Sequence, residues 1–96
     1  MYFLYILKSL KDHNGYVGTT DDTKERLEDH NAGRVKSTKH RRPFVIVRTE
    51  TFETLSEARK REWFYKCTPQ GGKLKRKILE MAGISLGFQP GSRSKT

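Results

Sequence analysis

Five polar residues of this chain have the types and the spacing to do chemistry: Tyr5, Tyr16, Arg26, His30 and Glu62. A phenol or an imidazole can transfer a proton, and a guanidinium can hold an anion through its rigid fork of N–H groups. A carboxylate suits a hard cation such as Mg²⁺. These groups can act together only if the fold brings them to one place. Whether it does depends on the strands and helices that carry them.

Arg26 and His30 lie in a segment, residues 22–31, whose pattern favours a helix that ends before Gly33. At about 100° per residue their side chains are only about 40° apart, one turn from each other. Leu27 is the only large apolar residue of this segment and must mark the buried direction. Both polar groups should therefore rise from one strip beside the sheet. The alternative is a solvated arginine and a helix-terminal histidine that the helix dipole favours.

Glu62 lies in a second predicted helix, residues 54–67, within the apolar stripe that Leu55, Ala58 and Tyr65 form. Burial of an unpaired carboxylate is strongly unfavourable. This carboxylate should therefore be paired, bound to a metal or located in a cleft, which makes Glu62 a candidate site residue. A structural salt bridge with a nearby arginine or lysine is the alternative.

The two tyrosines belong to the start of the chain, where residues 2–7 are apolar on both faces. Such a run predicts a central strand that is covered on both sides. Asn14 and Gly15 can take the positive φ values of a tight hairpin, which would pair a second strand, residues 16–19, antiparallel with the first.

In that hairpin, Tyr5 and Tyr16 come from neighbouring strands and can share a face, while Gly18 leaves the backbone open beside them. A phenol with an ordinary pKa near 10 acts as a base at neutral pH only if cationic neighbours lower that pKa. The alternative is that both tyrosines are core or rim residues of the sheet.

The rest of the chain is expected to supply a loop, a strand and two helices, at residues 33–43, 44–52, 54–67 and 73–81. Candidate N-caps of the first two helices are Thr20, Asp21, Asp22, Thr54 and Ser56. Pro69 would start a third helix only after a break in the chain, and the helical pattern begins at about Lys73. From Gly83 onward the periodicity is lost, so we expect one domain over residues 1–82 and a flexible basic tail over residues 83–96.

Composition restricts the class of protein. A chain of 96 residues fits one domain, and 20 Lys and Arg against 11 Asp and Glu leave a net charge of +9. This balance favours a polyanionic partner, with nucleic acid ahead of an anionic membrane surface. The chain shows neither a membrane span nor a secretory leader, so we expect a soluble, cytoplasmic protein. Cys67 is the only cysteine, which excludes an internal disulfide and a cysteine-built zinc site.

Cationic residues gather in two places, where they are expected to contact the nucleic-acid backbone. The first group is Arg34, Lys36, Lys39, His40, Arg41 and Arg42, and the second is Lys73, Lys75, Arg76 and Lys77. Contacts of this kind position a nucleic acid without reading its sequence, and they make binding sensitive to salt. The alternative is a surface that only keeps the protein in solution.

Several of these positions form an ordered pattern. Its segments are "FLY" at residues 3–5, "YVG" at residues 16–18, Arg26, "HN" at residues 30–31 and Glu62 within "EARKREWFYK". In this order, with ten residues between the two tyrosine motifs, they resemble the GIY-YIG nuclease superfamily. More narrowly, residues 2–80 are similar to small stand-alone members related to the N-terminal nuclease domain of the excision-repair protein UvrC. One departure is that Phe3-Leu4 replaces the name-giving Gly-Ile.

The resemblance implies an α+β fold with a three-stranded antiparallel sheet flanked by helices. It also implies cleavage of DNA phosphodiesters that depends on a divalent metal, Mg²⁺ or Mn²⁺, in repair or recombination. Glu62 would then hold the metal, and Arg26 would hold a phosphate oxygen. Tyr5 or Tyr16, assisted by His30, would accept the proton of the attacking water. A noncatalytic DNA- or RNA-binding module on the same scaffold is the rival reading, and either the basic surface or a protein partner would provide targeting.

Overall fold

Residues 1–86, which are the residues that the computed structural model describes, form three strands and three α-helices around one sheet. In chain order these elements are β1 (Tyr2–Ser9), β2 (Gly15–Thr20), α1 (Thr23–Asn31), β3 (Phe44–Phe52), α2 (Leu55–Cys67) and α3 (Pro69–Leu86). A short 3₁₀ helix, η1 (Lys39–Arg41), lies in the predicted basic loop before β3.

The sheet has the strand order β2-β1-β3, and both pairings are antiparallel. In the register of β1 and β2, Tyr5 is opposite Gly18 and Leu7 is opposite Tyr16. The predicted class, an α+β fold with a three-stranded antiparallel sheet flanked by helices, is confirmed.

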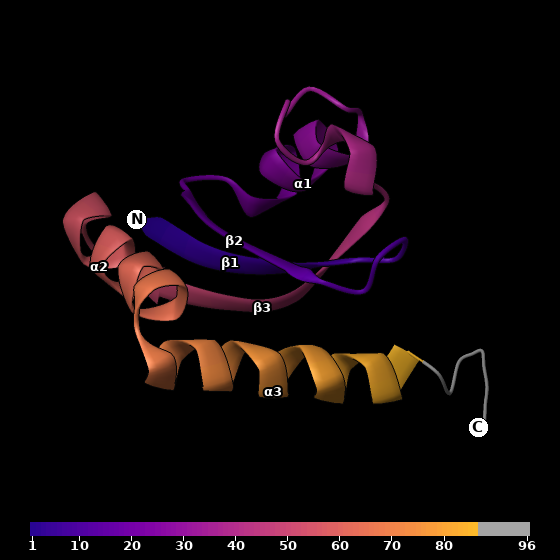
Figure 1. Ribbon diagram of the computed structural model, residues 1–96. Helices are drawn as coiled ribbons and strands as arrows, with labels where there is room; N and C mark the ends of the chain where they lie inside the picture. Colours follow the sequence, from indigo (N-terminus) through magenta and orange to yellow (C-terminus); the bar gives the residue numbers. More distant parts are fainter. Residues whose placement is uncertain (87–96) are drawn as a thin grey trace.

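Strand β1 is central, and its apolar residues are buried on both faces of the sheet. Leu4 and Ile6 belong to a core on the side of α2 and α3. Tyr5 and Leu7 belong to a second core, on the side of α1. Figure 1 shows α1 on one side of the sheet and α3 on the other. This two-sided cover explains why the segment lacks the polar alternation of a half-exposed strand.

The turn between β1 and β2 differs from the predicted one. Asn14 and Gly15 do not take positive φ values; the residue that does is His13, with φ of 65°, in a longer connection over residues 10–14. The Ser9 hydroxyl accepts hydrogen bonds from two backbone N–H groups of this connection. The side chain therefore orders the turn, and Gly15 becomes the first residue of β2.

Helix α3 begins at Pro69 rather than at the predicted Lys73. Proline is well suited to the first position of a helix because no intrahelical partner is needed for its missing N–H. The Thr68 hydroxyl accepts a hydrogen bond from the backbone N–H of Gly71 at 3.0 Å. A Cβ at Gly71 would lie 1.9 Å from the carbonyl oxygen of Phe64. Glycine is therefore required where α3 turns back against α2.

The far end of α3 also differs from the expected one, because the helix continues to Leu86. Residues 83–86 of the predicted tail thus belong to α3, and residues 87–96 lie outside the described part of the chain. None of the helices within residues 1–86 is both long enough and apolar enough to cross a membrane.

Candidate functional site

Tyr5 and Tyr16 lie on the same face of the sheet, as the hairpin prediction required. Because Tyr16 is opposite Leu7, it points to the side of the sheet that also carries Tyr5. The two ring centroids are 6.4 Å apart. A Cβ at Gly18 would lie 2.5 Å from the hydroxyl of Tyr5, so the glycine of the "YVG" segment provides the space that this phenol occupies.

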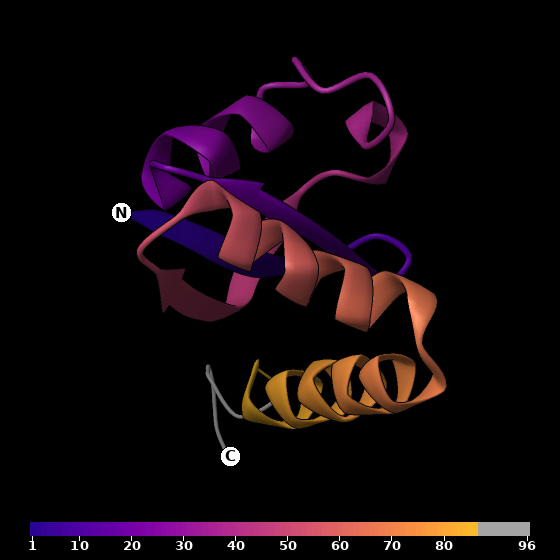
Figure 2. The ribbon, with the colours of Figure 1, turned by 90° about the vertical axis from the view of Figure 1, so that its left-hand side faces the viewer.

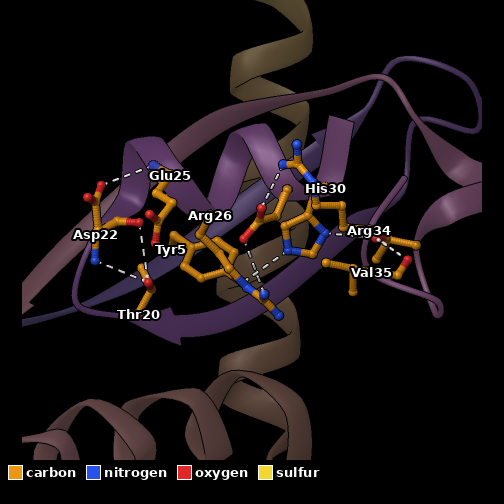
Figure 3. A network of polar contacts seen from close by, with 10 residues as sticks. Tyr5, Thr20, Asp22, Glu25, Arg26, His30, Arg34 and Val35 are labelled. Atoms are coloured by element: carbon orange, nitrogen blue, oxygen red, sulfur yellow. Dashed lines mark hydrogen bonds and ion pairs between the residues drawn. The ribbon is translucent and has the colours of Figure 1, made fainter. Parts of the chain in front are cut away.

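His30 connects the phenols to the predicted basic loop. Its ring centroid lies 4.9 Å from that of Tyr16, and its Nε2 is 3.1 Å from the hydroxyl of Tyr5. On the other side of the ring, Nδ1 is 2.7 Å from the Oγ1 of Thr38. Figure 3 shows the His30 ring between Tyr5 and the loop that contains Val35. His30 and Thr38 are both fully buried, so His30 lies in the last turn of α1, as the alternative has it, but its ring is packed between side chains.

The protonation of His30 follows from these contacts. Burial, and secondly the charge of Arg26, lower the pKa of His30 to about 4, so the imidazole is neutral at neutral pH. The Thr38 hydroxyl donates to the carbonyl oxygen of Val35. It can then accept a hydrogen bond from Nδ1–H, which leaves Nε2 to accept one from the Tyr5 hydroxyl. This arrangement satisfies every donor of the buried network.

Arg26 lies beside Tyr5 on the same side of the sheet (Figure 3). A hydrogen bond with the Tyr5 hydroxyl raises the pKa of Arg26. For Tyr5 itself, burial raises the pKa, and the hydrogen bond from Arg26 opposes this effect without overcoming it. Arg26 alone therefore does not lower the pKa of Tyr5, because desolvation of the phenolate is the larger effect.

Glu62 reaches the same region from α2, and it is also part of a salt bridge. Its Oε2 lies 2.7 Å from the Nζ of Lys66, one turn later. That Nζ lies 5.5 Å from the centroid of the Tyr16 ring, and the negative charge of Glu62 contributes to the raised pKa of Tyr5. The salt bridge of the alternative reading is thus present, but it lies beside the two phenols.

The donor set around Glu62 limits the kind of metal ion that fits. Within the described residues, no group of three or more His, Cys, Asp or Glu side chains could hold an ion. Zinc sites need three or four such ligands, whereas Mg²⁺ can use one carboxylate together with water and phosphate oxygens. The Glu62 side chain is 24% exposed, so such an ion could reach it. The residues present fit a hard divalent cation and do not fit zinc.

Three residues that support this geometry were not predicted from the sequence. Thr38 was part of a loop without periodicity, and no local signal indicates that its hydroxyl is buried. Lys66 could have been found from its spacing of four residues from Glu62. Asn31, although part of the recognised motif, was given no role; its side chain exchanges two hydrogen bonds with the backbone of Phe44 and so fixes α1 to β3.

The cationic residues of the predicted basic loop have different surroundings. Those with exposed side chains are Arg34, Lys36, Lys39, His40 and Arg42. Arg41 instead binds Asp12 at 2.7 Å and donates to the carbonyl oxygen of Gly15 at 3.2 Å. Its hydrogen bond lowers the pKa of Asp12 to about 2. Arg41 therefore holds the turn after β1 against η1.

The second cationic group belongs to α3, on the side of the sheet opposite α1 (Figure 1). Lys73, Arg76 and Lys77 are exposed there, and Lys75 is partly exposed. The structure therefore does not bring the two predicted basic groups together.

Comparison with known proteins gives consistent matches. Residues 1–75 match the family described as the GIY-YIG catalytic domain. A UPF0213 protein of Staphylococcus haemolyticus is 43% identical over 75 residues, which are 77% of this chain and 90% of that protein. The UPF0213 protein YazA of Bacillus subtilis is 38% identical over 81 residues, or 83% and 75% of the two chains. The solution NMR structure of a UPF0213 protein from Bacillus halodurans is 31% identical and covers 91% of this chain and 88% of that one, with a TM-score of 0.46.

Proposed function

This chain belongs to the GIY-YIG catalytic domain family, and from this premise we propose that it is a metal-dependent endonuclease that hydrolyses DNA phosphodiester bonds. The observation that carries the proposal is the approach of Tyr5, Tyr16, Arg26, His30 and Glu62 from β1, β2, α1 and α2. A role in DNA repair or recombination in the cytoplasm agrees with the resemblance and with the basic charge.

The two phenols have different roles in this proposal. Tyr5 is 2% exposed, its hydroxyl donates to His30, and its pKa is raised by burial, so it orients the site. Tyr16 is half-buried and has the ammonium group of Lys66 over its ring. Tyr16 is therefore the phenol that a water molecule can reach, and in its deprotonated, phenolate form it accepts the proton of the attacking water.

Arg26 binds a non-bridging oxygen of the scissile phosphate. Its contact with Asp29 is loose, at 3.8 Å, and its side chain is 37% exposed, so N–H donors are free for an anion. The planar fork of the guanidinium matches the geometry of a phosphate. His30, neutral and held by Thr38, fixes Tyr5 and thereby the place of Arg26 beside it.

Glu62 is the residue that would hold Mg²⁺ or Mn²⁺. When bound, a divalent cation neutralises charge on the phosphate and on the leaving oxygen. For Glu62 to hold the cation, its salt bridge with Lys66 has to break. The exposed ammonium group of Lys66 is then free to contact a phosphate of the substrate. The exposed cationic residues of the loop before β3 would bind the DNA backbone without reading sequence, with a protein partner as the other means of targeting.

The test is a cleavage assay on branched, single-stranded and duplex DNA, with and without Mg²⁺ or Mn²⁺. We expect metal-dependent cuts that disappear in Glu62→Gln. Glu53→Gln is the matched control, because Glu53 is an exposed carboxylate just before α2. Salt-sensitive binding without cuts on any substrate would instead identify a noncatalytic binding module and overturn the proposal.

A further inference from the structure

One side of α2 carries a large aromatic residue whose side chain is exposed to solvent. Trp63 is 61% exposed and is the only tryptophan of the chain. It bounds a shallow surface cavity of about 530 Å³ whose other lining residues are Leu55, Ser56, Arg59 and Lys60. An indole of this exposure contributes little to the core, so its flat face is free to contact another molecule.

The charge around Trp63 is positive and uncompensated. Arg59 and Lys60 are exposed, and among the side chains of residues 1–82 neither forms an ion pair with a carboxylate. Arg61, on the other side of the helix, is different because it binds Glu50 at 2.7 Å. An aromatic face between two unpaired cations suits a ligand that has both a planar group and negative charge.

This surface is continuous with the candidate site. At about 100° per residue, Lys66 lies between Glu62 and Trp63 around the helix, roughly 40° from the first and 60° from the second. Lys66 already binds Glu62 and lies over the Tyr16 ring. Figure 2 shows α2 running across the near side of the molecule, between α1 and α3. A strand held at Glu62 can therefore continue over Lys66 to Trp63.

We infer that Trp63, Arg59 and Lys60 form a binding surface for a single-stranded DNA segment, in which Trp63 stacks on an unpaired base. In a duplex the bases are stacked on each other, so an exposed indole finds a partner only where a strand is unpaired. Arg59 and Lys60 bind the phosphates on either side of that base. The inference rests on the proposed nuclease function, since it specifies which part of the substrate lies beside Glu62.

The single tryptophan gives a direct measurement. Its fluorescence is recorded while the wild-type protein is titrated with oligothymidylate, with a duplex, and with an abasic oligomer of the same number of phosphates. EDTA is present throughout, so binding is measured whether or not the protein cleaves DNA. We expect strong quenching by oligothymidylate and little quenching by the abasic oligomer or the duplex, because only an unpaired base can stack on Trp63.

Substitution tests the same contact by affinity. Trp63→Leu should weaken binding of oligothymidylate about 5- to 100-fold and should leave the affinity for the abasic oligomer unchanged. Met81→Ala is the matched control, because Met81 is also 61% exposed but lies on α3. Circular dichroism melting confirms that both variants are folded.

The outcomes separate this inference from the proposed function. Equal quenching by oligothymidylate and the abasic oligomer, or unchanged affinity in Trp63→Leu, would overturn the stacking surface even if the protein cleaves DNA. Base-dependent quenching in a protein that never cleaves DNA would support the surface and overturn the nuclease.

Discussion

Tyr5 and Tyr16 are neighbours on one face of the sheet, but they differ in their access to water. Tyr5 is buried, its hydroxyl donates to His30, and Arg26 lies close enough to affect its pKa. Tyr16 is half-buried and has Lys66 over its ring. Because a general base must reach the water that it deprotonates, exposure rather than motif order distinguishes the two phenols.

Replacement of each phenol by Phe should therefore have different effects. Tyr16→Phe is expected to lower the cleavage rate at least about 100-fold with little change in stability. Tyr5→Phe removes the donor to Nε2 of His30 and should cost about 1 kcal/mol of unfolding free energy, with a smaller loss of rate. Single-turnover cleavage and urea denaturation measure the two effects. Cleavage at the wild-type rate in both variants would contradict the role given to either phenol.

The buried imidazole makes stability depend on pH in a defined range. The pKa of His30 falls from 6.5 to about 4 on folding. Between these values the unfolded chain binds a proton that the folded chain does not, so the unfolding free energy should fall as the pH is lowered. The slope is at most about 1.4 kcal/mol per pH unit, and it vanishes above the unfolded pKa.

Urea denaturation at several pH values across this range measures that slope. His30→Gln should remove it, and His40→Gln, at an exposed position, should keep it. Asp12 contributes to the slope only near the acid end of this range, because its pKa falls from 3.8 to about 2 on folding and its contribution is lost between these values. An unchanged slope in His30→Gln would show that other groups control acid stability.

At the scale of elements, the corner between α2 and α3 depends on one of two adjacent glycines. A methyl group at Gly71 would meet the backbone of Phe64, whereas one at Gly72 would meet nothing within 4 Å. Gly71→Ala should therefore destabilise the protein by about 2 kcal/mol or more, because backbone atoms have to move. Gly72→Ala should be neutral or stabilise it by up to about 1 kcal/mol, since alanine favours a helix. Thermal unfolding compares the two, and equal melting temperatures would contradict the tight corner.

The sequence predicts a strand or helix correctly where neighbouring residues determine it. The apolar run of β1 is one case. The helix caps are another, because Asp22 accepts from the N–H of Glu25, and Thr54 and Glu57 form a capping box. Of the proposed candidates, Asp22 and Thr54 are the caps that the structure contains. Local patterns also predicted correctly which strand or helix carries each of the five polar residues of the site.

The errors lie where distant residues decide. Gly15 lies against Leu79, far along the chain, and Gly71 lies against the backbone of Phe64. Likewise, the role of Thr38 depends on an imidazole eight residues away that the fold buries. No local pattern contains such contacts, so the close approaches at Gly15 and Gly71 and the partner of His30 could not be predicted.

At the scale of the whole molecule, the two cationic groups lie on opposite sides of the sheet (Figure 1). The loop is on the side of α1, which also carries Tyr5, Tyr16 and His30. A DNA segment that occupies the site should therefore contact the loop more than α3.

Charge removal tests this asymmetry. Neutralising Arg34, Lys36 and Lys39 with Gln should reduce the salt dependence of DNA binding by about one unit for each phosphate contact that is lost. Replacement of Lys73, Arg76 and Lys77 by Gln should reduce the salt dependence less. Filter binding over a range of salt concentrations measures both slopes, and a larger loss from the α3 variant would place the DNA on the other side of the sheet.

The segment between Gly33 and Thr38 is hydrogen-bonded to His30 at both of its ends. The N–H of Gly33 donates to the carbonyl oxygen of His30, and the Thr38 hydroxyl binds the ring of His30. The number of residues between these two contacts can change while both contacts are kept, because surface loops tolerate insertions. Two residues inserted after Arg34, which keep the turn between Val35 and Thr38, should alter which DNA shapes are preferred and leave the turnover of a small phosphodiester unchanged. Such an insertion would change which nucleic acid the loop contacts while the reacting groups keep their places.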